Sequence, residues 1–202
     1  MKSIDFDHPP IDPVETCRVW FRESETMGFA NPNAMTLATV DAQGRPHARI
    51  VLLRGFGEQG ATFFTNRESD KGVQLAANAH AALLFHWDRE PIGRQIRIEG
   101  RVSVAPDADS DAYWNSRPRE SQINAWASQQ SRPVENRAAL QRAQSELERR
   151  FQGQPVPRPP HWGGYRVSLD RIEFWQGDRY RLHDRIVYAR TATGWSVQRL
   201  SP

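Results

Sequence analysis

Short apolar runs separated by turn residues are the feature of this chain that most constrains its fold. Runs of strand length cover residues 35–40, 48–53 and 61–65, and the segments 41–44 and 57–60 between them each end in glycine. This alternation predicts an antiparallel meander of short strands. A meander of this kind closes into a barrel or packs one face against helices.

Helical patterns interrupt the strands. Asp12 and Pro13 predict the capped start of a helix that runs to about residue 27, and Ser69 predicts the cap of a short helix that stops near Asn78. Further helices are expected over 107–116, 119–129 and 133–151, and further strands over 81–85, 95–104, 165–175, 182–190 and 195–200.

The predicted fold is therefore mainly β (α+β), a small barrel of antiparallel strands with flanking helices. A chain of 202 residues has the length of one domain, which we place at residues 12–202 after a lead of residues 1–11 that is expected to be disordered. Side chains fill the interior of a small barrel, so a ligand would bind outside it or at a subunit interface.

Composition narrows the class of function. The chain has 27 basic residues, of which only Lys2 and Lys71 are lysines, and its net charge is +3. Basic and acidic residues are interleaved, which disfavours nucleic-acid binding and favours a small anionic ligand, because arginine pairs well with phosphate and carboxylate. Cys17 is the single cysteine, which excludes an internal disulfide, and neither a leader nor a membrane span is evident. We expect a soluble cytoplasmic protein.

The stretch from Trp175 to Arg185 is unusually rich in planar side chains that bind anions or stack on rings. It predicts a polar connection between two strands. Because residues two apart on a strand point the same way, Arg181, His183 and Arg185 would form one binding face. A charged surface hairpin with solvated arginines is the alternative.

Two other clusters suit phosphate groups. Residues 65–71 place hydroxyl groups and Lys71 where a strand leads into a helix, and residues 116–122 place two arginines and a serine at the turn of a helix hairpin. The alternatives are that Asp70 only complements its helix dipole and that the second cluster is a solvated capping turn.

Gln95, Gln130 and Ser131 are suited to the polar edge of a heterocycle, although each taken singly is typical of a structural residue. The histidines and Cys17 do not have metal-ligand spacing, and we predict no metal site. No nucleophile motif or glycine-rich nucleotide loop occurs. A bound cofactor would therefore have to supply any chemistry that the side chains cannot perform themselves.

Seven segments in colinear order carry a resemblance to a known family. They are RIVLLR at 49–54, FFTN at 63–66, RQIRIEG at 94–100, SRPRESQI at 116–123, ASQQS at 127–131, HWGGYRV at 161–167 and IEFWQGDRYRLHDR at 172–185. Together they resemble the pyridoxamine (pyridoxine) 5'-phosphate oxidase family over about residues 31–202. The resemblance implies an FMN-binding split β-barrel and a homodimer with FMN at the subunit interface. It also implies oxidation of pyridoxamine or pyridoxine 5'-phosphate to pyridoxal 5'-phosphate with O2.

The resemblance further implies site residues. The family's FMN contacts fall on Arg49, Ile50, Val51, Leu52, Leu53, Arg54, Phe64, Thr65, Lys71, Gln95, Gln130, Ser131, Trp175 and Arg185. Its substrate contacts fall on Arg54, Tyr113, Arg117, Ser121, Arg181, Leu182 and His183. Of these, Tyr113, Arg117 and Ser121 would hold the substrate phosphate. The catalytic pair, Arg181 and His183, would place substrate C4' for hydride transfer to flavin N5.

Three residues depart from the family's usual pattern: Arg54 stands for lysine, Phe64 for tyrosine and Asp70 for arginine. An aspartate near the FMN phosphate would make this chain bind FMN more weakly than its relatives. Three alternatives to the oxidase are a split-barrel flavoenzyme acting on another ring substrate, such as the phenazine-pathway relatives, a non-catalytic carrier of flavin or pyridoxal phosphate, and a small RNA-binding protein. The intact SRPRESQ segment favours the oxidase over the first of these.

Overall fold

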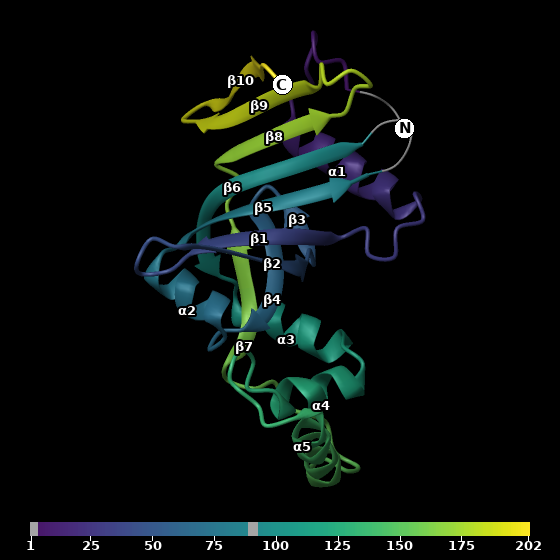
Figure 1. Ribbon diagram of the computed structural model, residues 1–202, viewed down its shortest axis with the longest axis vertical. Helices are drawn as coiled ribbons and strands as arrows, with labels where there is room; N and C mark the ends of the chain where they lie inside the picture. The colour runs from purple at the N-terminus through teal and green to yellow at the C-terminus, as the bar shows by residue number, and fades with distance from the viewer. Residues whose placement is uncertain (1–3, 89–92) are drawn as a thin grey trace.

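The computed structural model describes residues 4–88 and 93–202 and confirms the predicted fold class, a curled, split antiparallel barrel with flanking helices (Figure 1). Within these residues the strand order is β10-β9-β8-β6-β5-β1-β2, with β3, β4 and β7 off this path. The strands are β1 (Ala34–Val40), β2 (Pro46–Leu52), β3 (Gly55–Gly57), β4 (Gly60–Asn66), β5 (His80–Trp87), β6 (Arg94–Val104), β7 (Trp162–Val167), β8 (Arg171–Gln176), β9 (Asp184–Thr191) and β10 (Gly194–Leu200).

The long strand β6 joins the two parts of the barrel. Its first six residues pair with β8, whereas Val102 to Val104 pair with β7, which in turn pairs with β4. Gly100 lies between these two segments, and a Cβ there would lie 2.0 Å from the Ser168 carbonyl oxygen. Only glycine allows this close approach of two backbones. The sheet therefore curls around β6 instead of extending flat.

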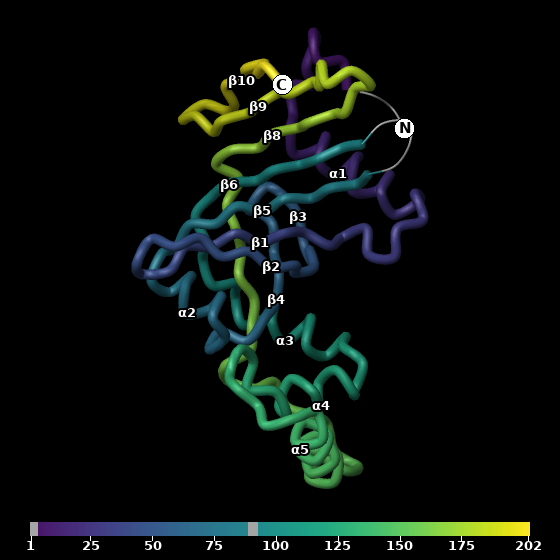
Figure 2. Tube along the Cα trace, in the orientation of Figure 1, coloured from purple at the N-terminus to yellow at the C-terminus, as the bar shows by residue number. Residues whose placement is uncertain are grey.

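Five helices accompany the sheet in the described part of the chain: α1 (Pro13–Glu25), α2 (Asp70–Ala77), α3 (Asp107–Ser116), α4 (Arg119–Ala127) and α5 (Arg137–Arg150). As predicted, Asp12 caps α1, because its carboxylate accepts hydrogen bonds from the amides of Val14 and Glu15. None of the described helices is long and apolar enough to cross a membrane. The chain trace shows α3, α4 and α5 at the opposite end of the molecule from β8, β9 and β10 (Figure 2).

Two hydrophobic clusters stabilise these two ends. The larger one lies between the sheet and α1, where the Trp20 ring packs edge-on against Phe174 at 5.2 Å. The smaller one is built from α3, α4, the segment after α5 and the start of β7, and its buried members are Trp114, Ile123, Phe151, Val156 and Trp162. The candidate site residues of α3 and α4 therefore rest on their own aromatic cluster.

Several boundaries differ from the predictions. The strand expected over 165–175 is two strands, β7 and β8, because the chain turns at Ser168, whose hydroxyl contacts both Arg101 and Asp170. The helix expected from residue 133 begins later, where the Asn136 side chain caps α5. The short strand β3 was not predicted.

The N-terminal lead also differs from the expected disorder over the part that the structure describes. Residues 4–11 have no regular secondary structure, but Ile4 and Phe6 are buried in the larger cluster. The Tyr188 hydroxyl donates a 2.8 Å hydrogen bond to the Pro10 carbonyl, and Arg199 pairs with Asp7. Apolar burial thus offsets the ordering of a segment that lacks helix or strand patterns.

Candidate functional site

A cavity of about 260 Å³ lies where β2, β4 and α2 meet the α3–α4 hairpin, and most of its lining was predicted from the sequence. Its lining residues are Ile50, Val51, Leu52, Arg54, Phe64, Thr65, Lys71, Tyr113, Arg117, Gln130 and Trp162. An adjoining polar cavity of about 330 Å³ shares Arg117 and Gln130 and adds Ser121. Leu53 is not part of the first lining and packs against the larger hydrophobic cluster instead.

Lys71 is the buried cation of this cavity. Its ammonium donates hydrogen bonds to Gln130 Oε1 at 2.7 Å and to Ser69 Oγ at 3.1 Å, and Thr65 Oγ1 donates to the same Gln130 oxygen at 3.2 Å. Burial, with a smaller contribution from the charge of Arg49, lowers the pKa of Lys71 to about 8. Because its pKa is lowered in this way, the charged form of Lys71 would be stabilised by a bound anion.

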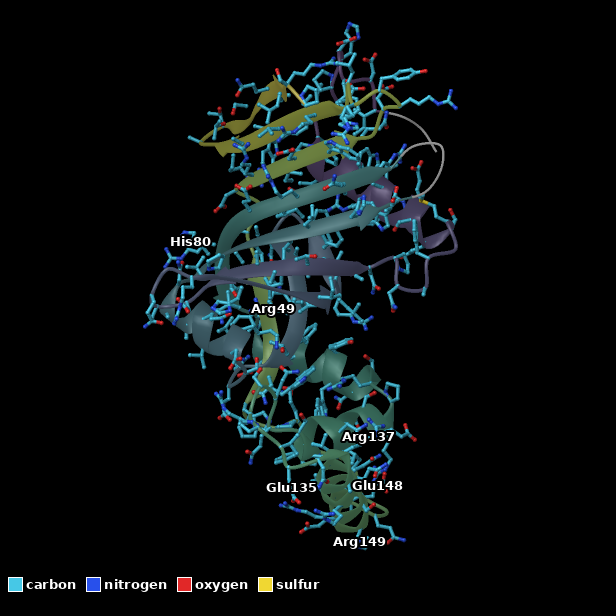
Figure 3. All side chains as sticks on the ribbon, viewed as in Figure 1. Arg49, His80, Glu135, Arg137, Glu148 and Arg149 are labelled. Atoms are coloured by element: carbon cyan, nitrogen blue, oxygen red, sulfur yellow. The ribbon has the colours of Figure 1, made fainter. Side chains whose placement is uncertain are left out.

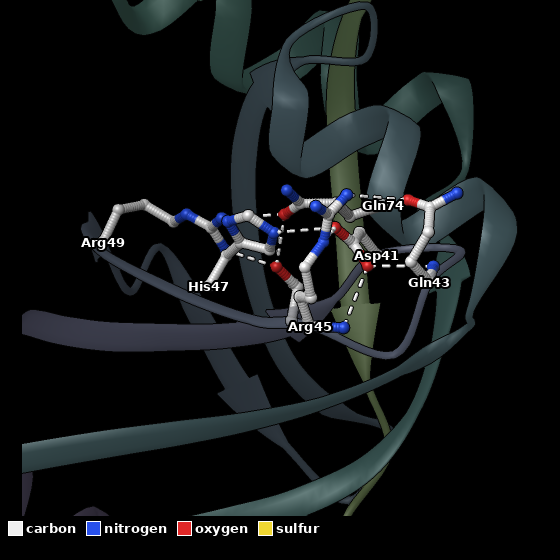
Figure 4. Close-up of polar contacts among 7 residues, drawn as sticks. Asp41, Gln43, Arg45, His47, Arg49 and Gln74 are labelled. Atoms are coloured by element: carbon white, nitrogen blue, oxygen red, sulfur yellow. Dashed lines mark hydrogen bonds and ion pairs between the residues drawn. The ribbon is translucent and has the colours of Figure 1, made fainter.

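Arg49 is held beside Lys71 by a network that the sequence did not predict. Its Nη1 donates to Thr39 Oγ1 at 2.5 Å and its Nη2 donates to Gln74 Oε1 at 2.8 Å (Figure 4). Thr39 also donates to Gln74 Oε1 at 2.6 Å, in the buried interior. Burial lowers the pKa of Arg49, and Asp70 partly opposes this shift. Gln74 was missed because a glutamine inside a helix carries no motif.

Arg117 lies on the other side of the cavity, against the rings of Trp114 and Trp162. The centre of its guanidinium lies 5.1 Å from the Trp114 ring and 4.9 Å from the Trp162 ring. Its Nη1 is buried and has no hydrogen-bond partner in the described structure. Burial lowers the pKa of Arg117, with an opposing contribution from Tyr113. A partly buried guanidinium with a buried, unused donor is suited to an anionic ligand group.

Phe64 and Tyr113 line the cavity between these two cationic regions. Their rings stack at 4.4 Å, and each also stacks on Trp162, at 5.6 Å and 6.0 Å respectively. The exposed Arg54 lies over Tyr113 at 5.4 Å. An apolar wall with arginine at its edge is suited to a flat aromatic ligand that carries a charge.

The remaining predicted residues form a second group at the sheet end that contains β8 and β9. Gln95, Trp175 and Arg185 lie side by side in register across β6, β8 and β9. The His183 ring lies 4.8 Å from Trp175, and its Nδ1 accepts a hydrogen bond from the Asp178 amide. Strands β8 and β9 lie toward the top of Figure 1, whereas α3 and α4, next to which the cavity lies, are in its lower part.

The prediction that Arg181, His183 and Arg185 share one strand face is wrong. Strand β9 begins only at Asp184, and Arg181 lies in the preceding turn with a left-handed backbone, φ 64°. Alternation along a strand therefore cannot align the three side chains. A non-glycine residue in the left-handed region is uncommon and is concentrated at functional sites and turns.

Arg185 is anchored by Glu173, which sequence reasoning also missed. The buried Glu173 carboxylate accepts from Arg185 Nε at 2.9 Å and pairs with Arg97 at 2.5 Å. A lone glutamate among apolar strand residues has no recognisable spacing. Only strand pairing shows that it lies between two arginines.

Asp70 forms an ion pair with Arg132, which was not among the predicted site residues. Its carboxylate lies 3.3 Å from Arg132 Nη1, and Arg132 also donates to the Glu68 carbonyl at 2.8 Å. Both side chains are about half exposed. Arg132 thus offsets the negative charge that Asp70 adds beside Lys71. Ser131, next to it, has a left-handed backbone with φ 70°.

Comparison with known proteins identifies the family. A family model described as "Pyridoxamine 5'-phosphate oxidase" matches residues 23–150, and one described as "Pyridoxine 5'-phosphate oxidase C-terminal dimerisation region" matches residues 162–202. The chain belongs to the pyridoxamine 5'-phosphate oxidase family. It is therefore of the oxidoreductase type that this family represents, and its split barrel agrees with the predicted fold.

Curated members of the pyridoxamine 5'-phosphate oxidase family align with nearly the whole chain. The pyridoxine/pyridoxamine 5'-phosphate oxidase of Rubrobacter xylanophilus is 52% identical over 95% of this chain and 87% of its own length. Pyridoxine/pyridoxamine 5'-phosphate oxidase 1 of Ralstonia nicotianae is 53% identical over 99% of this chain and 93% of its own length.

Solved structures of related proteins include one with a phenazine-type carboxylic acid bound. The structure of PhzG from Burkholderia lata, in complex with tetrahydrophenazine-1-carboxylic acid, matches with a TM-score of 0.90 at 31% identity and covers 100% of both chains. An FMN-binding protein from Nostoc punctiforme, related to pyridoxamine 5'-phosphate oxidase, matches in fold with a TM-score of 0.71 at 18% identity and covers 98% of this chain and 100% of its own. Family membership alone therefore leaves the ring substrate to be argued from the site.

Proposed function

We propose that this protein is an FMN-dependent oxidase that converts pyridoxamine or pyridoxine 5'-phosphate to pyridoxal 5'-phosphate with O2. The observation that carries the proposal is that Lys71 and Arg117, two cations whose pKa values burial lowers, line one cavity with an aromatic wall, in addition to the exposed Arg54. Two phosphorylated ring molecules, a flavin nucleotide and a substrate, would use both cations. A site for one anion would need only one of them.

The residues around Lys71 suit the phosphate end of FMN. Lys71, Arg49 and Thr65 would hold that phosphate, since they combine one buried cation and one partly buried cation with a hydroxyl group. Gln130, Ser131 and residues 50–54, at the end of β2 and just after it, would line the rest of the cofactor. When bound, FMN would supply the acceptor for a hydride from substrate C4' and the reactivity toward O2.

A homodimer would complete this site. Strands β8 and β9 lie at the opposite end of the molecule from α3 and α4 (Figure 1). In a single chain, Gln95, Trp175 and Arg185 lie in register across β6, β8 and β9, and none of them lines the cavity. Their predicted role in FMN binding thus requires a second copy that presents its β8–β9 end to this cavity. The match of residues 162–202 to a dimerisation region supports the same arrangement.

The substrate would bind on the Arg117 side. Arg117 and Ser121 line the adjoining polar cavity and would hold the substrate phosphate together with Tyr113. Arg181, Leu182 and His183 of the partner would cover the pyridine ring and orient C4'. Positioning and charge stabilisation account for this chemistry without a strong general base.

A second candidate is oxidation of a phenazine-type carboxylic acid. The overall similarity to PhzG favours it, and Arg117 can pair with a carboxylate as well as with a phosphate. The two candidates differ in the ligand that reduces the flavin. Anaerobic mixing of the FMN-loaded protein with pyridoxine 5'-phosphate is expected to bleach the flavin absorbance, whereas a reduced phenazine carboxylic acid should not. The reverse result would establish the second candidate, and bleaching by neither would indicate a carrier.

The catalytic pair can be tested in the same experiment. Arg181→Ala and His183→Ala are expected to slow flavin reduction or weaken substrate binding while FMN stays bound, because their proposed partner is the substrate ring. Loss of FMN from both variants would show that these residues contact the cofactor instead.

A further inference from the structure

Trp162 connects the aromatic wall of the cavity to the Arg117 guanidinium. It is the first residue of β7, 6% exposed, and it lines both the main cavity and the adjoining polar cavity. Its ring stacks on Phe64 and Tyr113, packs edge-on against Trp114 at 5.0 Å and lies 4.9 Å from Arg117. No other described ring makes all of these contacts.

We propose that Trp162 is a positioning residue that sets the preference for a phosphorylated ligand. This inference rests on the proposed function, since it assigns the Arg117 side of the cavity to the substrate phosphate. The indole face holds the guanidinium by a cation–π contact and keeps its buried Nη1 without a protein partner. That donor is therefore available for a ligand oxygen at no cost of breaking an existing hydrogen bond.

Trp114 lies equally close to Arg117 but has a different role. It is 1% exposed, and its indole nitrogen donates a 2.9 Å hydrogen bond to the Val156 carbonyl inside the smaller cluster. It does not line either cavity. Substitution of Trp114 would remove core packing, so it cannot separate positioning from stability. Substitution of Trp162 can separate these two effects, because Trp162 lines both cavities.

The test compares the binding of pyridoxal 5'-phosphate and pyridoxal to the FMN-loaded protein by titration calorimetry. The readout is the ratio of the two dissociation constants, because lost packing weakens both ligands alike and leaves the ratio unchanged. Trp162→Leu is expected to reduce the ratio by about tenfold, while Trp162→Phe, which keeps an aromatic face, should stay within about threefold of the parent ratio.

Trp126→Leu is the matched control. Trp126 packs on the same cluster and bonds to the Pro157 carbonyl, but it lines neither cavity. It should leave the ratio unchanged. Should the leucine variant at position 162 not fold, Trp162→Tyr and Trp162→Met replace it, with the tyrosine variant expected to keep the higher ratio.

The outcomes separate this inference from the function it rests on. A strong phosphate preference that survives unchanged in Trp162→Leu, or equal ratios for the tyrosine and methionine variants, would overturn the role of Trp162 alone. A parent protein that binds both ligands equally would overturn the phosphate assignment of Arg117, and the role of Trp162 with it.

Discussion

Lys71 donates a 2.7 Å hydrogen bond to the side-chain oxygen of Gln130, although 59 residues separate the two in sequence. This contact ties α2 to the segment that follows α4. It also places a buried lysine, with a pKa lowered to about 8, beside the residues predicted to hold the flavin. The protonation of Lys71 should therefore control the affinity for the cofactor.

FMN affinity is expected to fall as the pH rises above about 8. A bound phosphate would favour the ammonium form and raise the pKa of Lys71 in the complex. The binding energy from this contact is then fully present below the free-state pKa of about 8 and is lost progressively as the pH rises from there to the raised pKa of the complex. Titration of apoprotein with FMN from about pH 7 to about pH 9.5 should show a loss on the order of tenfold. Lys71→Arg should flatten this dependence, and a flat profile in the parent would contradict the prediction.

Asp70→Arg should tighten FMN binding. Asp70 is a negative charge next to Lys71 that Arg132 offsets through an exposed ion pair. Reversing the charge adds a cation near the proposed phosphate site, which should improve the dissociation constant by roughly tenfold at low salt and by less at high salt. Glu148→Arg makes the same charge change on α5, far from Arg49 in Figure 3, and should leave FMN affinity alone. Equal affinities of the parent and Asp70→Arg at low salt would refute the prediction.

Gln74→Leu should destabilise the fold. The substitution removes the oxygen that accepts from Thr39 and Arg49, so one buried donor and one partly buried donor lose this partner. Urea denaturation should show a loss of roughly 1 to 3 kcal/mol. Gln43→Leu is the control: this exposed glutamine contacts Arg45 in the turn shown in Figure 4, and its substitution should change stability by less than about 0.5 kcal/mol. Similar losses in both variants would argue against the network.

Glu173→Gln should cost more stability than Glu99→Gln. Glu173 is buried between Arg97 and Arg185, so a neutral amide there weakens two charge-assisted contacts, at a cost of roughly 1 to 3 kcal/mol. Glu99 also pairs with Arg97, but it is 40% exposed, and its loss should cost less than about 1 kcal/mol. Thermal unfolding of both variants without FMN provides the comparison. A larger loss in Glu99→Gln would contradict the assigned burial.

The local conformational preferences of its residues predicted the strands and turns in the first half of the chain. The segment 41–44 forms the turn between β1 and β2 because Asp41 accepts from the amides of Gln43 and Arg45 and because Gly44 takes a positive φ of 79°. These preferences depend on neighbours in sequence, so the sequence alone determined them. The same holds for the helix cap at Asp12 and the stop at Asn78.

The motifs also determined which residue types line the cavity. Thr65, Lys71 and Arg117 were predicted from clusters of phosphate-binding side chains, and each lies in its lining. Sequence could not separate β7 from β8, because the apolar pattern continues through both and only contacts to Arg101 and Asp170 fix the turn. Nor could it show that Arg181 lies in a turn before β9.

Tertiary structure alone decided which groups meet. The sequence predicted the helix that contains Gln74, but not that Gln74 would hold Arg49, and it placed Trp162 in no predicted element and did not show that Trp162 would lie over Arg117. Such contacts join segments that are tens of residues apart, and they depend on how the sheet curls around β6. Local preference determines the conformation of a segment. Which other segments it contacts in space is determined by burial across the whole chain. The candidate site could therefore be recognised only in the folded protein.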